Sequence, residues 1–297
     1  MRLAVPDRYD FGRTLGQLAM GRYDPCARFV DGSFWLALRT PEGPGTLSLS
    51  RVGGELQAKA YGPGAGWLLD RAKAVAGLHD DLDGFGELAG SHPVVARLAR
   101  VHSGLRLPAT GRIFPRLLRN ILEQKVTGKE AYRAYAATMR HFAEPAPGPL
   151  DGLLLPPDPR AVAGTPYWVY HPFGVEQRRS DTLRRAAAVA ERLEACTDAA
   201  EATRRLIAIP GIGPWTAAEV VRVVYGDPDA VSVGDYHIPH MVAWALAGEP
   251  RASDARMLEL LEPFRGHRGR VCTLLEAAGL GAPRFGPRMQ IRSFARF

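Results

Sequence analysis

Asp235 is the residue of this sequence best placed to act as a fixed anion. It follows the stretch VSVG and precedes YHIPHMVAWAL, which has the composition of a helix. An aspartate at this point is a favourable N-cap, because its side-chain oxygen accepts N–H groups of the first helical turn. The positive end of a helix also keeps a carboxylate ionised and fixed in direction. Cleavage of a glycosidic bond needs such an anion beside the developing oxocarbenium ion, so capping and catalysis are compatible roles.

A second stretch, LIAIPGIGPWT, places two glycines and two prolines between two helical runs. Gly211 and Gly213 permit backbone conformations that a Cβ would forbid, and they let another backbone come close. Pro214 suits the first position of the second helix, where its missing N–H would have had no partner. Such a turn leaves N–H groups at a helix N-terminus, which bind phosphate without side-chain charge. The alternative is a structural turn that buries Ile209 and Ile212, and for an isolated Gly-x-Gly this is the commoner explanation.

The elements that must hold these residues fall into two parts. Residues 23–62 carry alternating, β-branched or aromatic side chains between Gly- and Pro-containing turns, which predicts a small antiparallel meander. The stretch 66–78 has helical spacing, and we expect it to cover one face of that sheet. Later strand signals nearly vanish, and helices are expected at 92–102, 112–124, 128–143, 158–164, 178–195, 199–208, 214–225, 236–247, 253–263 and 268–278.

We therefore expect an α+β protein with a small N-terminal antiparallel sheet and its helices, followed by a mostly all-α body. The predicted boundary separates an N-terminal domain, 1–90, from a helical domain, 91–297, whose hairpin spans 199–225. The arginine-rich stretch 284–297 lacks a clear period and is expected to be irregular.

The charge of the chain indicates the class of partner. The sequence of 297 residues is long enough for two or three packed units and has a formal net charge of +7. Only Lys59, Lys73, Lys125 and Lys129 are lysines, and the planar fork of arginine suits phosphate. A basic excess favours a polyanion, with nucleic acid the leading candidate. The alternative is solubility combined with the arginine bias of a GC-rich genome.

The cysteines and the apolar runs exclude other classes. Cys26, Cys196 and Cys272 are far apart in the sequence, so they indicate neither a disulfide framework nor a metal quartet. Apolar runs are too short to span a membrane, and the N-terminus lacks a signal-peptide core. The sequence therefore favours a cytoplasmic protein without a membrane partner.

The order of the motifs indicates a family. The string from Ile209 to Gly213 resembles the helix-hairpin-helix motif of DNA-binding proteins. A hairpin followed after about twenty residues by a Gly-containing loop and an Asp resembles the helix-hairpin-helix-GPD superfamily of DNA glycosylases. FGRTLG, GLRLP, ILEQKVT and GIGPWTAAE, in that order, look like its 3-methyladenine DNA glycosylase II (AlkA) branch. That branch has an N-terminal α/β domain and two helical subdomains, and the resemblance covers nearly the whole chain.

The resemblance implies roles for individual residues. Asp235 matches the catalytic aspartate of the family. Gly211, Gly213 and Thr216 match the hairpin positions that bind phosphates of the lesion strand.

The resemblance also implies what the protein binds. No cofactor is required, although the carbonyls of Ile207, Ile209 and Ile212 match those that hold a monovalent cation, Na⁺ or K⁺, in some relatives. The implied partner is double-stranded DNA containing damaged bases, and the implied state is a monomer.

Trp215 bears on the type of reaction, because bifunctional members of the superfamily carry a lysine nucleophile at this position. Schiff-base chemistry needs an amine, and no lysine follows Lys129 in the sequence. We therefore expect a monofunctional enzyme in which water is the nucleophile. The four-cysteine iron–sulfur loop of endonuclease III-like members is also absent, since Cys272 is the one cysteine in the last hundred residues.

Gln124 and Lys125 match the turn that enters the DNA gap left by a flipped nucleotide, and Gln124 also borders the base pocket. Lys125 departs from the apolar residue expected in this branch. Its four-carbon stem would fill the gap while its ammonium reaches a phosphate. A helix-end lysine in solvent is an equally weighted alternative.

Trp215 and Tyr236 are the expected walls of the base pocket, because an aromatic face suits an extruded and above all a cationic base. Core packing is the alternative for both. Glu219 is also assigned to the pocket, but it stands where the branch commonly has an aromatic residue. The segment PFRGHRGRVCTLLEA lacks the tryptophan that relatives place there. We therefore expect a wider or more polar pocket, which leaves the range of lesions open.

The stretch between the two helical subdomains offers further aromatic and basic residues. Its aromatic side chains either line the pocket or, as we favour for most, pack between domains: Tyr167, Trp168, Tyr170 and Phe173. Its arginines either meet phosphate or form a solvated helix face: Arg178, Arg179, Arg184 and Arg185.

The expected function is base excision by a monofunctional DNA glycosylase that flips out N3- or N7-alkylated purines and hydrolyses their N-glycosidic bond. A cationic base leaves as a neutral molecule and needs no general acid, which fits a site with one carboxylate and no evident acid partner. Three alternatives stay open. They are another lesion class (bulky alkyl adducts, deaminated or oxidised purines), a bifunctional lyase, and a non-catalytic protein that binds damaged DNA.

Overall fold

The computed structural model describes residues 1–282. The arginine-rich stretch 284–297, expected to be irregular, lies outside these residues.

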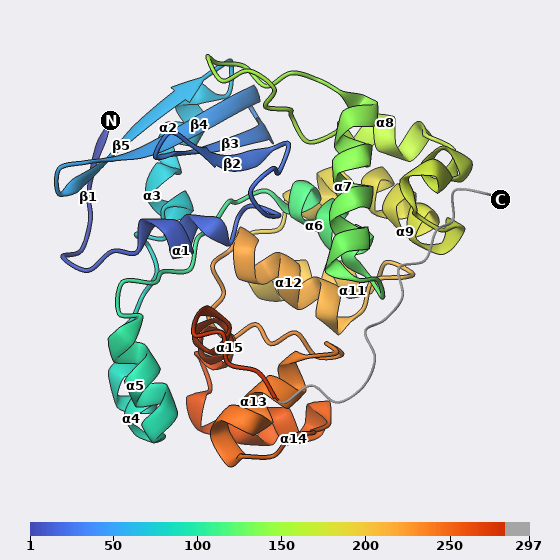
Figure 1. Ribbon diagram of the computed structural model, residues 1–297. Helices are drawn as coiled ribbons and strands as arrows, with labels where there is room; N and C mark the ends of the chain where they lie inside the picture. Colours follow the sequence, from blue (N-terminus) through green and yellow to red (C-terminus); the bar gives the residue numbers. More distant parts are fainter. Residues whose placement is uncertain (283–297) are drawn as a thin grey trace.

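An antiparallel sheet forms the N-terminal part of the fold (Figure 1), in the strand order β1-β5-β4-β3-β2. Asp31 and Gly32, both with positive φ, make the two-residue turn that sets the register Val30↔Ser33 between β2 and β3. The predicted meander is confirmed, whereas the three-residue edge strand β1 was not predicted. The strands are β1 (Arg2–Ala4), β2 (Ala27–Val30), β3 (Ser33–Thr40), β4 (Gly43–Val52) and β5 (Glu55–Tyr61).

Helices make up most of the remaining chain. The ten predicted helical stretches are present, although 178–195 is interrupted at Val189 and the stretch at 236–247 becomes helical only at Ile238. The short helices α1 and α4 and the 3₁₀ helix η1 were not predicted. The bounds are α1 (Phe11–Gly16), α2 (Ala65–Asp70), α3 (Ala72–Val75), α4 (Phe85–Gly90), α5 (Pro93–Val101), α6 (Ile113–Glu123), α7 (Gly128–Phe142), α8 (Pro159–Gly164), η1 (Tyr167–Phe173), α9 (Gln177–Ala188), α10 (Ala190–Glu194), α11 (Ala199–Ile207), α12 (Pro214–Val224), α13 (Ile238–Ala247), α14 (Asp254–Leu261), η2 (Glu262–Phe264) and α15 (Arg268–Ala277).

Three large hydrophobic clusters organise residues 1–282. The first lies between the sheet and α1–α3, and α2 packs on β4 and β5 as the sequence predicts. The second joins α6–α12. The third joins α4 and α5 to α13–α15, segments from distant parts of the chain. The α+β class is therefore confirmed. The domain boundary at residue 90 stays a prediction, and Phe85 and Ala89, just before it, pack in the third cluster.

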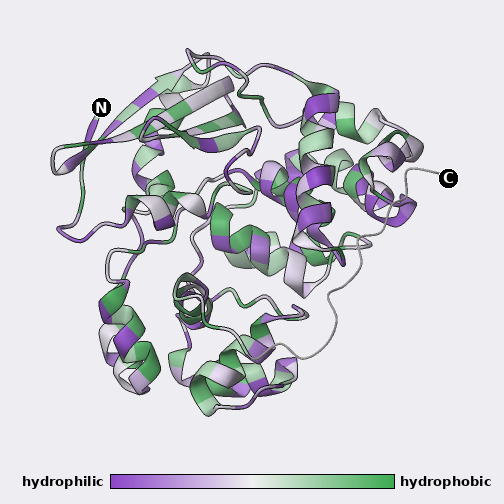
Figure 2. Cartoon of the chain, in the orientation of Figure 1, coloured by the Kyte–Doolittle hydropathy of each residue, from purple (hydrophilic) through white to green (hydrophobic). Residues whose placement is uncertain are grey.

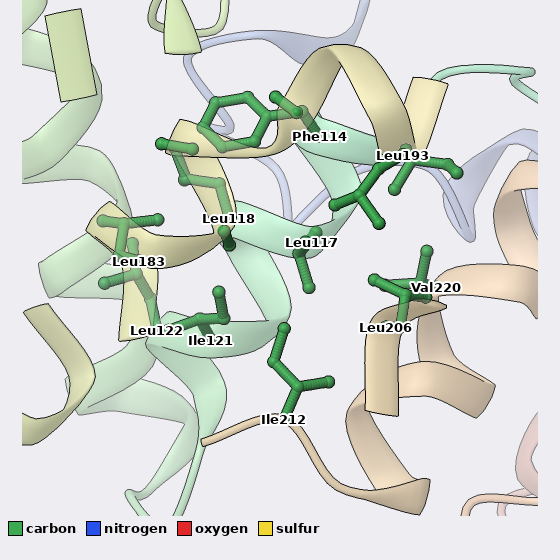
Figure 3. Close-up of a cluster of buried hydrophobic side chains, with 14 of the residues drawn as sticks. Phe114, Leu117, Leu118, Ile121, Leu122, Leu183, Leu193, Leu206, Ile212 and Val220 are labelled. Carbon is green, nitrogen blue, oxygen red and sulfur yellow. The ribbon is translucent and has the colours of Figure 1, made fainter. Parts of the chain in front are cut away.

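The hairpin between α11 and α12 is anchored by its isoleucines. Ile212 points toward Ile121 of α6 (Figure 3), and Ile209 and Ile212 are 8% and 5% exposed. Their burial confirms the structural part of the hairpin interpretation. Figure 2 shows α12 largely in the hydrophobic colour, as expected for a helix enclosed by its neighbours. Among residues 1–282, none of the helices combines the length and the apolar character needed to cross a bilayer.

Candidate active site

The Asp235 carboxylate is held from both of its oxygens. Oδ1 accepts the backbone N–H groups of His237 (2.6 Å) and Ile238 (2.9 Å), at the start of α13. Oδ2 accepts the indole N–H of Trp215 (2.9 Å), from the first turn of α12. Asp235 therefore binds the first N–H groups of α13, as the sequence predicts, although the N-cap position itself is occupied by His237, two residues later. Three donors restrict the direction of the carboxylate.

Trp215 makes a contact that the sequence did not predict. Its half-buried ring was assigned to the wall of the base pocket, but its Nε1–H is committed to Asp235. The hydrogen bond joins α12, which belongs to the second hydrophobic cluster, to the loop that leads into the third. The indole N–H of Trp215 can donate this hydrogen bond, but an indole supplies no amine nucleophile. Trp215 is therefore suited to orienting the carboxylate and not to Schiff-base chemistry.

The two hairpin glycines lie in different structural surroundings. Gly211 has φ +100°, and a Cβ there would lie 2.1 Å from Oγ1 of Thr182. Gly213 is the N-cap of α12, with φ −110° and no atom within 4 Å of an added Cβ. No side chain caps α12 within the described residues. The N-terminus of α12 thus has open space beside Gly213 and no capping side chain, and the N–H groups of such a helix start suit an anion.

Gln124 ties the end of α6 to the hairpin. Its Nε2 donates to the carbonyl of Gly211 (3.1 Å) and to Oγ1 of Thr216 (2.9 Å). Thr216 is 2% exposed, so a contact from this residue to phosphate would come from its backbone N–H.

Lys125 follows Gln124 with φ +54°, in the left-handed region that a non-glycine residue rarely adopts. Its side chain is exposed. The bonds of Gln124 bring this lysine to the hairpin, although the two are far apart in sequence. Sequence distance alone therefore does not separate an amine from the site, and Lys125 needs a direct test of Schiff-base chemistry.

Glu219 lies in a buried ion cluster behind the loop that carries Asp235. Its Oε2 accepts from Arg116 (3.0 Å) and Arg222 (2.8 Å), and its Oε1 accepts from Ser232 (2.6 Å). Burial would raise the pKa of this carboxyl, but the two guanidinium groups outweigh burial and lower it to about 2. Both oxygens are occupied, so Glu219 supports the Asp235 loop through Ser232. Its assignment to the pocket wall stays a prediction, and no pattern in the sequence indicated a role for Arg116 or Ser232.

The remaining candidates divide by exposure. Tyr236 is 74% exposed with its ring edge-on to His237, whereas Tyr170 is fully buried, as the packing interpretation expects. Arg179 contradicts both of its predicted roles. It is 2% exposed and donates to the carbonyls of Leu122 and Gly174, because the end of α6 needs donors for its free carbonyl groups.

The candidate cation ligands lie on the hairpin. The carbonyl of Ile209 accepts the N–H of Ile212 (3.0 Å) and keeps a second lone pair. The cation site at Ile207, Ile209 and Ile212 stays a prediction. A cavity of about 300 Å³ lies elsewhere, lined by residues that include Asp80, Tyr225 and His267, and it includes none of the site residues.

Comparisons with known proteins bear on the fold. The structure superposes on a 3-methyladenine DNA-glycosylase from Archaeoglobus fulgidus with a TM-score of 0.75 and 15% identity, covering 93% of this chain and 97% of the other. The chain has the fold of the helix-hairpin-helix DNA glycosylases. The same glycosylase fold recurs in the 8-oxoguanine glycosylase/lyase of Clostridium acetobutylicum, with a TM-score of 0.68, 12% identity and coverage of 91% and 92%.

A similarity in sequence accompanies the glycosylase fold. The chain is 27% identical over 251 residues to the probable bifunctional transcriptional activator/DNA repair enzyme AlkA of Mycobacterium tuberculosis. The match covers 79% of this chain and 48% of that protein, so the chain spans about half the length of the curated relatives it matches. No protein-family model matches the sequence. The resemblance to the AlkA-like branch is confirmed by sequence and fold together.

Proposed function

We propose that the chain is a monofunctional DNA glycosylase that hydrolyses the N-glycosidic bond of alkylated purines in double-stranded DNA. The Asp235 carboxylate carries the proposal. Two backbone N–H groups and one indole N–H hold it as a directed anion that remains half-exposed. A fixed anion of this kind stabilises an oxocarbenium-like sugar.

The other residues of the site bind the DNA. The N–H groups at the start of α12 hold a phosphate of the lesion strand, while the Gln124–Lys125 turn fills the gap left by the flipped nucleotide. The base enters beside Trp215 and Tyr236. The C1′–N bond breaks with its electron pair leaving on the base, and Asp235 stabilises the sugar cation. Water then adds to C1′ and releases one proton to the solvent. In this proposal the protein acts as a monomer that binds one lesion at a time.

We also propose that a monovalent cation sits at the hairpin. Carbonyl oxygens are the donors that Na⁺ and K⁺ accept, and Ile207 is 45% exposed at the surface. The ion would be held by the carbonyls of Ile207, Ile209 and Ile212, where it would offset phosphate charge. Replacing KCl and NaCl by a tetraalkylammonium salt at equal ionic strength should weaken DNA binding.

The first test is a panel of end-labelled duplexes, each with one modified base, incubated with the wild-type protein and Asp235→Asn. We expect alkali-dependent strand cleavage of alkylated-purine duplexes by the wild type. The variant should be slower by about a hundredfold or more, because it loses the anion, and should still bind DNA. Asp70→Asn, an exposed change on α2, is the matched control.

Two outcomes would overturn parts of the proposal. Equal excision by wild type and Asp235→Asn would remove the catalytic role of Asp235. Strand cleavage without alkali, with borohydride trapping that disappears in Lys125→Ala, would make the enzyme a lyase. The panel also decides the second candidate, a different lesion class on the same fold, which the polar Glu219 in place of an aromatic residue favours.

A further inference from the structure

Basic side chains line one side of α7, the helix that follows the Gln124–Lys125 turn. Lys129, Arg133 and Arg140 are exposed. Because an α-helix has about 3.6 residues per turn, these three side chains fall within about 40° of one another around the helix axis. Figure 2 shows the hydrophilic colour along the visible side of α7. A basic stripe therefore leads away from the proposed site.

The cations of this stripe are not neutralised by the protein in the way that other helical arginines are. Several helices pair an arginine with an acid one turn away, as in Arg119–Glu123, Arg184–Asp181 and Arg205–Glu201.

Within residues 1–282, the side chains of Lys129, Arg133 and Arg140 make no ion pair and no hydrogen bond. The one acid of α7, Glu130, accepts the N–H and the hydroxyl of Thr127 at the start of the helix. The three positive charges are therefore available to an anion from outside the chain.

A loop of the N-terminal part extends the stripe. The hydroxyl of Tyr132, on α7, donates to the carbonyl of Tyr23 (3.0 Å). Tyr23 is 67% exposed, and the Arg22 guanidinium lies 5.4 Å from the centre of its ring. The next residue, Asp24, is 1% exposed, and its carboxylate accepts backbone N–H groups inside the protein. We call Lys129, Arg133, Arg140 and Arg22 the α7 track.

The length and chemistry of the α7 track fit the backbone of duplex DNA. At about 1.5 Å per residue, Lys129 and Arg140 are separated by about 17 Å along the helix. Each strand carries one negative charge per about 3.4 Å of duplex axis, so this length corresponds to about five phosphates. Exposed lysines and arginines that contact phosphates carry no sequence information. The track therefore suits the backbone of any duplex, damaged or not.

We propose that the α7 track is a DNA-binding surface independent of the lesion, and that it keeps the protein on a duplex during the search for damage. The inference rests on the proposed glycosylase function and adds a step before base flipping. The track begins four residues after Lys125, so one duplex lies along both. Electrostatic contacts of this kind let a protein slide along DNA.

The first test measures binding to an undamaged duplex by fluorescence anisotropy over a series of KCl concentrations. The variant combines Lys129→Gln, Arg133→Gln and Arg140→Gln, which keep long side chains but remove three charges. We expect affinity at low salt to fall by about tenfold or more. The slope of log K against log salt should become less steep by about two to three, because each lost phosphate contact removes about 0.9.

The matched control removes the same kinds of charge from another part of the surface. It combines Lys73→Gln, Arg97→Gln and Arg100→Gln, at exposed positions of α3 and α5. In Figure 1, α5 lies away from α7. The control has the same net charge as the track variant, and we expect it to keep the wild-type slope.

The second test follows the search itself. A duplex with two 7-methylguanines is bound, and an excess of unlabelled duplex then captures any protein that dissociates. The wild type should remove both bases from one duplex more often than the track variant does. Single-turnover excision of one 7-methylguanine at saturating protein should be equal for the two proteins, which also shows that the variant is folded.

The outcomes separate this inference from the proposed function. Equal salt slopes for the track variant and the wild type overturn the inference, as does an equal loss of slope in the control. Unchanged removal of lesion pairs by the track variant contradicts the role in searching. A wild type that excises no modified base contradicts the proposed function, while the salt slopes still decide whether the α7 track binds DNA.

Discussion

At the scale of single residues, the contact between Trp215 and Asp235 is the feature that bears most directly on the proposed type of reaction. The indole N–H supplies one of three hydrogen bonds to the carboxylate and fixes the oxygen that the backbone does not reach. In the proposed mechanism Trp215 is a positioning residue, since it would act on the sugar through Asp235.

We expect Trp215→Phe to lower the single-turnover excision of an alkylated purine by about tenfold or more, because a hydrogen bond to a charged group contributes about 1.5–3 kcal/mol. Phenylalanine keeps an aromatic face for the base but has no N–H donor. DNA affinity, measured by fluorescence anisotropy, should change little.

Trp244→Phe, a partly exposed position on α13, is the control for this substitution. A Trp215→Phe protein that loses affinity but not rate would mean that the indole serves as a stacking surface only.

The residue types were readable from the sequence, but this contact was not. The hydrogen bonds from the start of α13 to Asp235 follow from local rules, because the donors lie two and three residues away. The indole bond depends on how α12 and the Asp235 loop are placed against each other, and no local pattern encodes that placement.

At the scale of elements, the hairpin needs its first glycine for folding and its second for access. Gly211 lies under Thr182 with positive φ, whereas Gly213 is extended and open. Sequence rules treat Gly211 and Gly213 alike, because they predict the turn but not which neighbouring atoms lie against each glycine.

Gly211→Ala should lower the free energy of unfolding by about 2 kcal/mol or more, from the strained φ and the collision with Thr182. Adding Thr182→Ala should restore part of the loss, because it removes the collision and leaves the φ strain. Urea unfolding followed by circular dichroism measures both.

Gly213→Ala is the matched change in the same turn and should leave the unfolding midpoint nearly unchanged. Its methyl group faces the proposed phosphate site, so we expect weaker DNA binding. Wild-type affinity in Gly213→Ala would place the phosphate elsewhere.

The long helices were predictable because their apolar spacing repeats over several turns. The helices α1 and α4 have six residues each, too few to establish a period. The break at Val189 also has no proline or glycine to announce it.

At the scale of the whole molecule, the cluster of Glu219, Arg116 and Arg222 connects α6, α12 and the Asp235 loop through buried charges. The pKa of the Glu219 carboxyl, about 2, lies below the ordinary value of 4.5. A carboxyl group whose pKa is lowered by folding stabilises the folded state when the pH is above the pKa of the unfolded chain. This contribution is lost as the pH falls toward 2, the pKa in the folded state.

We expect Glu219→Gln to reduce the free energy of unfolding at pH 7 by about 3 kcal/mol, since it leaves two buried guanidinium groups without their anion. The variant should also lose part of the stability change that the wild type shows between pH 4.5 and 2. Glu191→Gln, whose side chain is 83% exposed, should have little effect on either quantity. Unfolding curves at a series of pH values provide the comparison, and parallel curves for wild type and Glu219→Gln would contradict the assigned pKa.

The third hydrophobic cluster has a consequence for synthesis of the chain. Phe85 and Val95, in α4 and α5, are covered by Val242, Met257 and Val271 from α13–α15. During translation, α4 and α5 leave the ribosome before most of the helical body has been synthesised. Their apolar sides therefore stay uncovered until the last helices are made. The loop that carries Asp235 lies between these two segments in the sequence. Nascent chains that end before α15 therefore present an uncovered apolar surface, a natural place for a chaperone to bind.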